Sequence, residues 1–180
     1  MEILRVVITG TVGAGKTSFI RTISEIEVVD TDRRATDETA QLKRNTTVAF
    51  DFGRLTIGPE QAMHLYGTPG QSRFDFMWDI LIRKAHAYIL LVNASRPRDL
   101  RNGRRILNFM NQRAQIPMII GLSHMDNPDA WEPDNIALAL GLLDEKKRPP
   151  LVRLDATNQE SVSNTLIALI EEMMSISVLQ

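Results

Sequence analysis

The chain has 180 residues, a formal net charge of −1 and no cysteine. This size predicts one domain over residues 1–180, and the missing thiols exclude a disulfide framework, a thiolate zinc site and a cysteine nucleophile. The balanced charge disfavours a general nucleic-acid binder. Because no cationic leader precedes an apolar stretch and no apolar run reaches the roughly 18 residues of a membrane span, we expect a soluble, cytoplasmic chain.

Short apolar runs predict the strands of a buried parallel sheet, at residues 3–8, 87–92, 117–122 and 150–154. Helical patterns lie between and after them. One covers residues 133–143, and another follows the last strand, with apolar residues at three- and four-residue steps from Val162 to Ile176. This alternation is typical of an α/β layer sandwich.

The middle of the chain has a different pattern. Residues 47–57 and 61–66 resemble strands joined at Gly58-Pro59, which predicts an antiparallel hairpin, and residues 30–45 predict a long polar surface loop. The predicted fold is therefore α/β, a mostly parallel six-stranded sheet with one antiparallel edge strand and helices on both faces.

The first predicted strand leads into a phosphate-binding loop. Residues 10–17 fit G-x-x-x-x-G-K-[ST], directly before a helical stretch at 18–26. In such a loop, backbone N–H groups and the helix N-terminus bind phosphate, the lysine bridges the terminal phosphates and the threonine hydroxyl binds Mg²⁺. The predicted nucleotide-binding residues here are Gly10, Val12, Gly13, Ala14, Gly15, Lys16, Thr17 and Ser18.

The segment after the hairpin separates GTPases from other phosphate-loop proteins. Residues 66–74 resemble the second switch of Ras-superfamily GTPases, whose glycine senses the γ-phosphate and whose glutamine orients the attacking water; Gly70 and Gln71 match. Thr47 resembles the first-switch threonine that ligates Mg²⁺, with Thr46 in reserve. The resemblance therefore implies that Gln71 and Lys16 are catalytic residues.

The base-recognition motif of that superfamily, N-K-x-D, corresponds here to Ser123, His124 and Asp126. A carboxylate at Asp126 can accept hydrogen bonds from both guanine N1–H and the exocyclic amine, and adenine has no such donor pair. The loop at 155–157 resembles the one whose backbone contacts guanine O6, with Ala156 and Thr157 at the matching positions. The implied ligands are GTP or GDP with Mg²⁺.

Two departures from the superfamily pattern bear on the chemistry. Gly67 stands where most members have an aspartate that holds Mg²⁺ through water, a feature shared with the bacterial Ras-like GTPases of the gliding-motility and cell-polarity type. Asp51 is our candidate to replace the missing acid. The alternative is that its carboxylate only forms hydrogen bonds within the sheet. The predicted metal-binding residues are thus Thr17, Thr47 and Asp51. Ser123 and His124 are expected to remove a tether to the phosphate loop and a side chain lying on the base.

Two surface features suggest protein partners. Residues 74–81 are rich in apolar side chains, so exposed ones near the second switch predict an effector surface; burial is the alternative. The resemblance implies a roadblock-type regulator that binds there, from Phe74 to Leu81, and around Thr47. A second feature is a run of arginines within residues 96–113, which is a solvated face or a site for an acidic partner or for anionic lipid head groups. They are Arg96, Arg98, Arg101, Arg104, Arg105 and Arg113.

The sequence thus favours a small GTPase, a GTP-binding switch that hydrolyses GTP slowly and signals through its switch loops. Two alternatives remain: a nucleotide-binding scaffold, or pseudo-GTPase, with little or no hydrolysis, and a phosphate-loop protein that uses ATP. Gln71 favours hydrolysis over the scaffold, and Asp126 favours guanine over adenine.

Overall fold

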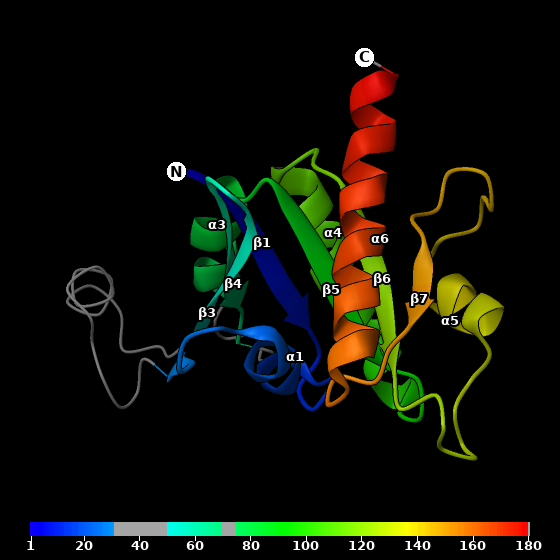
Figure 1. Ribbon diagram of the computed structural model, residues 1–180. Helices are drawn as coiled ribbons and strands as arrows, with labels where there is room; N and C mark the ends of the chain where they lie inside the picture. Colours follow the sequence, from blue (N-terminus) through cyan, green and yellow to red (C-terminus); the bar gives the residue numbers. More distant parts are fainter. Residues whose placement is uncertain (31–49, 70–74, 180) are drawn as a thin grey trace.

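The computed structural model describes residues 1–30, 50–69 and 75–179. Its centre is a seven-stranded sheet with the order β2-β3-β4-β1-β5-β6-β7 (Figure 1). The strands are β1 (Glu2–Gly10), β2 (Val29–Asp30), β3 (Asp51–Gly58), β4 (Gln61–Gly67), β5 (Ala87–Asn93), β6 (Met118–Ser123) and β7 (Leu151–Arg153). The helices are α1 (Lys16–Ile23), α3 (Asp75–Arg83), the short 3₁₀ helix η2 (Pro97–Asp99), α4 (Leu100–Arg113), α5 (Pro133–Ala139) and α6 (Gln159–Val178).

Parallel pairing in the middle of the sheet follows from the apolar runs. β1 pairs in parallel with β4 and β5, and β6 pairs in parallel with β5 and β7. All seven residues of β5 and all six of β6 are buried. Strands covered on both faces need apolar side chains throughout, which explains why the sequence shows continuous runs there and no alternation.

Helices cover both faces of the sheet, and each face has its own core. In Figure 1, α1 and α6 lie in front of the sheet, and their Phe19 and Leu166 pack in one apolar cluster with Ile8 and Ile89. Helices α3, α4 and α5 lie on the other face, where Trp78 and Ile106 belong to a second cluster. The predicted α/β layers are therefore confirmed.

Helix ends differ from the predicted bounds for local reasons. Helix α5 stops at Ala139, before the predicted end at 143, because Gly141 has a φ of +83° and reverses the chain. The Leu142 N–H then donates to the Ala137 carbonyl and the Gly141 N–H to the Leu138 carbonyl, which is the Schellman pattern of a helix C-terminus.

The hairpin is present, with β3 antiparallel to β4. β3 begins at Asp51 in the described part of the chain, and the predicted start at residue 47 lies outside the described residues. The sheet has one strand more than the six predicted. The additional strand is the two-residue β2, which pairs with the start of β3. Among the described residues, no helix is long and apolar enough to cross a membrane.

Candidate functional site

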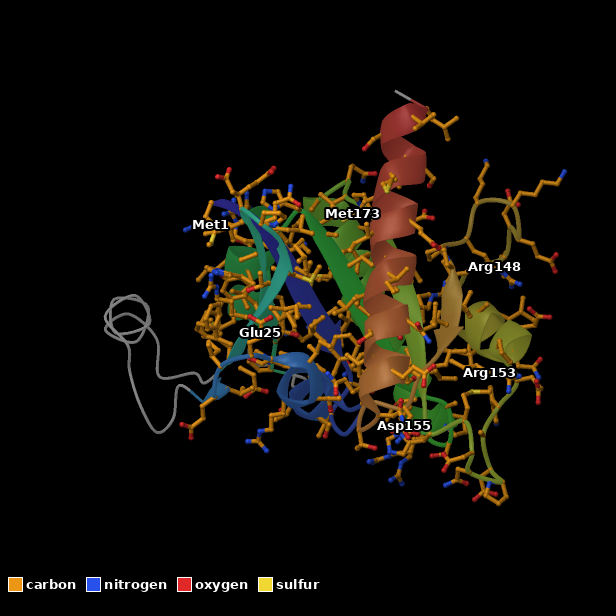
Figure 2. The ribbon with its side chains drawn as sticks, in the orientation of Figure 1. Met1, Glu25, Arg148, Arg153, Asp155 and Met173 are labelled. Carbon is orange, nitrogen blue, oxygen red and sulfur yellow. The ribbon has the colours of Figure 1, made fainter. Side chains whose placement is uncertain are left out.

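A cleft of about 810 Å³ opens at the carboxyl ends of β6 and β7, beside the start of α1. Ligands of α/β sheets bind at this edge, where loops from several parallel strands meet. Figure 2 labels Arg153 and Asp155 there, at the end of β7 and on the loop to α6. The cleft is lined by Gly13, Gly15, Lys16, Thr17, Ser18, Ser123, His124, Met125, Asp126, Arg153, Leu154, Asp155, Ala156, Thr157 and Ser161.

The loop between β1 and α1 has the backbone of an anion-binding turn. Gly13 and Gly15 have φ values of +76° and +102°, which side chains other than glycine rarely allow. Gly15 is the N-cap of α1, no side chain caps that end, and its first turn holds no acidic residue. The N–H groups and the positive end of the helix dipole are therefore open to a phosphate.

Lys16 folds back over this loop. Its ammonium donates hydrogen bonds to the carbonyls of Gly10 at 2.9 Å and Thr11 at 2.6 Å. Burial lowers the pKa of Lys16 from 10.5 to about 8, while the nearby Asp51 carboxylate raises it. The lysine is therefore a poorly solvated cation at the mouth of the cleft, where a phosphate would supply the missing negative charge.

Asp51, the first residue of β3, lies against the first turn of α1. The Thr17 hydroxyl donates a hydrogen bond to the Asp51 carboxylate. Asp51 also pairs directly with Gly67 across the β3–β4 ladder. A Cβ added at Gly67 would lie 3.2 Å from Asp51 Cβ and 3.5 Å from its Oδ2, so the Asp51 side chain stands where a side chain from position 67 would extend.

The pair of Thr17 and Asp51 fits Mg²⁺ by the chemistry of its oxygens. Mg²⁺ is usually held by one or two carboxylates together with substrate phosphates and water. No group of three or more His, Cys, Asp or Glu among the described residues could hold a metal. The hydroxyl and carboxylate beside Lys16 would therefore share an ion with a bound phosphate and would not form a complete protein site.

Ser123 ties the base side of the cleft to the phosphate loop. Its buried hydroxyl donates to the Ala14 carbonyl at 2.8 Å. The expectation that Ser123 removes the tether is therefore wrong, because a short side chain at the end of β6 still reaches that loop. The same hydroxyl lies 3.0 Å from His124 Nδ1, so the tether also contacts the next residue of the base side.

The two other base-side residues lie on the turn after β6. His124 has a φ of +58°, a left-handed conformation that is uncommon outside glycine. Asp126 is exposed at the cleft and accepts no hydrogen bond from the residues that the structure describes. Its carboxylate is thus open to the donors of a bound ligand.

The loop from β7 to α6 is ordered by its own side chains. The Asp155 carboxylate accepts from the Thr157 hydroxyl at 2.7 Å and backbone N–H at 3.0 Å. These bonds, with His124 nearby, lower the pKa of Asp155. The Ala156 carbonyl accepts from Thr22 on α1 at 2.6 Å, while its N–H donates to none of the described residues. The loop therefore presents one backbone donor next to a fixed carboxylate.

Most predicted binding residues meet in one cleft, with three exceptions on the phosphate loop. Gly10, Val12 and Ala14 belong to the loop but do not line the cleft; Val12 is 54% exposed and Ala14 is buried. Thr46, Thr47, Gly70 and Gln71 lie outside the described residues.

The predicted effector segment is largely buried. Met77, Trp78 and Leu81 pack in the core, and Trp78 Nε1 donates to the Pro69 carbonyl at 2.7 Å. Phe76 is exposed, Ile80 is half-buried and Phe74 lies outside the described residues. Burial, the alternative, therefore holds for Met77, Trp78 and Leu81, because one amphipathic helix places these side chains against the sheet. The effector surface from Phe74 to Leu81 stays a prediction.

Sequence reasoning missed several residues of the site. Met125, Arg153, Leu154, Asp155 and Ser161 line the cleft. Their position directly after predicted parallel strands, or in the loop that follows, was a signal that could have found most of them. Outside the cleft, Arg96 also reaches the phosphate loop: a Cβ at Gly13 would lie 3.4 Å from its Nη1.

The fold and the cleft together define a P-loop nucleotide-binding protein. The chain belongs to the family described as "Conserved hypothetical ATP binding protein", whose model matches residues 26–176. That range begins after the phosphate loop and extends into α6, so it covers the hairpin and the base side of the cleft.

Two further likenesses agree with this class. The uncharacterized protein MJ1339 of Methanocaldococcus jannaschii is 30% identical over 94 residues, which are 52% of this chain and 53% of that protein. The match thus spans about half the length of this relative. The bacterial selenocysteine-specific elongation factor EF-Sec has a TM-score of 0.65 at 20% identity, over 97% of this chain and 29% of that chain. The latter likeness shows the fold alone.

Proposed function

We propose that the protein is a guanine-nucleotide switch that binds GTP with Mg²⁺ over residues 1–180 and hydrolyses it slowly. The observation that supports guanine best is Asp126, an exposed carboxylate without a described partner, in the same cleft as Lys16. Guanine offers it two adjacent donors, N1–H and the exocyclic amine, whereas adenine presents an unprotonated N1. The free Ala156 N–H would donate to guanine O6.

In this proposal the loop backbone and five side chains act on the phosphates and the metal ion. Backbone N–H groups of the loop and the Lys16 ammonium bind the phosphates. Thr17 and Asp51, with Thr47 from the first switch, hold Mg²⁺, which when bound neutralises charge that develops on the phosphates. Gln71 orients the attacking water, and Gly70 senses the γ-phosphate.

The family description supports the rival, a protein that uses ATP. Mass spectrometry of the nucleotide released from the purified protein separates the two, followed by competition between GDP and ADP. A lost pair of hydrogen bonds at Asp126 costs on the order of 1–3 kcal/mol, so we expect GDP to bind roughly ten- to a hundredfold more tightly. Comparable dissociation constants, or bound ADP alone, would reject guanine specificity.

The variant Asp126→Asn sharpens this comparison. Its amide offers a donor where the carboxylate offered an acceptor, so guanine should be weakened selectively and xanthine, whose O2 accepts, should be favoured. The matched control is Asp129→Asn, since Asp129 is exposed on the same turn and does not line the cleft. A loss of affinity for guanine and adenine alike would show that Asp126 holds the loop and does not read the base.

Turnover is expected to be slow, and a regulator of the roadblock type to bind near the switches. A supplied arginine typically contributes about 10³–10⁵ in rate. Arg33, Arg34 and Arg44 on the first switch, or Arg96 beside the phosphate loop, are the internal alternatives. Single-turnover hydrolysis by the isolated chain decides: rapid cleavage lost in one of these arginine variants rejects dependence on a partner. No cleavage with or without a regulator would favour the nucleotide-binding scaffold.

A further inference from the structure

A second cavity is lined by residues of α3, α4 and the 3₁₀ helix before α4. Figure 1 shows α3 and α4 on the opposite face of the sheet from α1 and α6. The cavity has a volume of about 820 Å³ and shares no residue with the nucleotide cleft. Among the described residues, its lining holds one carboxylate, Asp75, and five arginines: Arg98, Arg101, Arg104, Arg105 and Arg113. We call this cavity the arginine groove.

Three of these arginines are held in place by the protein. Arg113 Nε donates to Asp79 at 3.1 Å, and its guanidinium lies 3.5 Å from the centre of the Phe109 ring. Arg105 pairs with Asp75 at 3.5 Å. The Arg104 guanidinium packs against Gly141, where a Cβ would lie 3.0 Å from its Nε. Side chains fixed in this way lose less rotamer freedom when they bind a ligand.

Like Arg104, the other two arginines have no counter-ion among the described residues. Arg98 and Arg101 are exposed and form no ion pair with any residue that the structure describes. They stand on the first turn of α4 and the 3₁₀ helix before it, close to the positive end of the α4 dipole. Arg98, Arg101 and Arg104 therefore carry positive charge that no carboxylate among the described residues balances.

We propose that the arginine groove binds an acidic segment of a partner protein. A carboxylate already occupies part of it, since Asp75 on α3 lines the groove and is the counter-ion of Arg105. The lining adds the side-chain amides of Asn108 and Gln112, groups that can donate to and accept from a peptide backbone. Planar guanidinium groups recognise further carboxylates with two parallel hydrogen bonds.

Two other anionic ligands fit this lining less well. Single-stranded nucleic acid needs aromatic faces for base stacking. Phe109, the one aromatic among the described lining residues, is covered by Arg113 and makes a T-shaped contact with Trp78, with 5.4 Å between the ring centres. A membrane surface favours apolar side chains that insert beside the cations, and none of the described lining residues has an aliphatic side chain.

The test measures binding of a fluorescein-labelled oligoglutamate peptide by fluorescence anisotropy, at low and at physiological salt. The variant Arg98→Glu/Arg101→Glu changes two exposed residues that lack internal partners, so the fold should persist, as circular dichroism and retained nucleotide binding would verify. We expect the peptide to bind about tenfold or more weakly to this variant. The control Lys146→Glu/Lys147→Glu makes the same change in net charge on an exposed turn and should alter binding by less than about twofold.

Each contrary result overturns the proposal. Undetectable peptide binding rejects the site, and equal losses in the two variants show nonspecific attraction. Tighter binding of a single-stranded DNA oligonucleotide or of phosphatidylserine vesicles, lost in Arg98→Glu/Arg101→Glu, assigns the groove to that other class of ligand. Because the groove is separate from the cleft, these outcomes do not depend on which nucleotide the protein binds.

Discussion

Asp51 and Gly67 face each other on neighbouring antiparallel strands, and the acidic side chain of the first fills the space beside the second. The carboxylate reaches the Thr17 hydroxyl from β3, a strand that enters the sheet in the opposite direction to β1 and β4. An acid can therefore reach the first turn of α1 although position 67 carries none.

We predict that Asp51→Ala weakens the dependence of nucleotide binding on Mg²⁺. Loss of a carboxylate near a metal commonly costs about 10–100-fold in metal affinity. A titration of Mg²⁺ at fixed fluorescent GTP, at pH 7, should show a midpoint raised by at least about tenfold. Glu25→Ala is the control, because Glu25 accepts from Thr56 outside the cleft.

An exchange of Asp51 and Gly67 tests whether a carboxylate at position 67 can replace the one at position 51. Gly67→Asp alone should lower stability, since its Cβ would lie 2.9 Å from Ile20 Cδ1 and close to the Asp51 side chain. Combining it with Asp51→Gly should recover part of the Mg²⁺ dependence lost in the single Asp51 variant. If the midpoint of the Mg²⁺ titration is unchanged in Asp51→Ala, Asp51 does not hold the ion and only accepts a hydrogen bond from Thr17.

The pKa of Lys16 predicts a pH dependence of nucleotide affinity. With a pKa of about 8, the free protein loses the charge of Lys16 above that pH. Since bound phosphate requires the charged form, each pH unit above 8 should cost up to about 1.4 kcal/mol of binding free energy, or tenfold. Calorimetry at pH 9 in buffers of different ionisation enthalpy should record proton uptake on binding.

The lowered pKa of Lys16 also makes the stability of the nucleotide-free protein depend on pH, in the opposite direction to the nucleotide affinity. Between pH 8 and 10.5 the unfolded chain keeps the Lys16 proton and the folded chain does not, so this contribution to stability rises with pH. The variant Lys16→Met should bind nucleotide weakly at every pH and lose the step near 8. A wild-type affinity that is flat from pH 7 to 9.5 would contradict the lowered pKa.

The tether from Ser123 predicts a coupled loss of stability and affinity. Ser123→Ala removes the donor to the buried Ala14 carbonyl, at a cost of about 1–3 kcal/mol. We expect thermal unfolding to shift down by roughly 2–4 °C per kcal/mol, together with weaker nucleotide binding. Ser95→Ala is the matched control, because Ser95 donates to Asn93 and does not line the cleft; equal effects of the two variants would argue against the tether.

Trp78 should contribute to stability through its indole N–H as well as its packing. Trp78→Phe loses the hydrogen bond to the Pro69 carbonyl and part of a fully buried ring, so we expect about 2–4 kcal/mol less stability in urea unfolding followed by circular dichroism. Trp131→Phe, at a ring that is 42% exposed, should cost under about 1 kcal/mol. Similar losses in both variants would contradict the role of the buried indole.

The layers of the fold could be predicted because each depends on a local pattern. Continuous apolar runs gave β5 and β6, and the Gly58-Pro59 turn gave the hairpin. The end of α5 and the pairing of β2 could not be predicted, because the first depends on the φ of Gly141 and the second on two residues whose partner strand lies far along the chain.

The residues of the site could be predicted where they form a continuous sequence motif. They could much less be predicted where residues far apart in the chain come together. Lys16 and Thr17 follow from their spacing alone, whereas the bond between Thr17 and Asp51 joins residues 34 positions apart. Ser123 shows the limit of reasoning from residue types. Its side chain is shorter than asparagine, yet the close approach of β6 to the phosphate loop lets the hydroxyl reach Ala14.

The Asp79 carboxylate links α3 to α4. It accepts from Arg83 on its own helix at 2.9 Å and from Arg113 on α4 at 3.1 Å, bonds that lower its pKa and so keep it charged in mild acid. The T-shaped contact between the rings of Trp78 and Phe109 is a second contact between the two helices. The Pro69 carbonyl is thus connected, through the Trp78 indole and the neighbouring Asp79 carboxylate, to α4, the helix that carries the arginines.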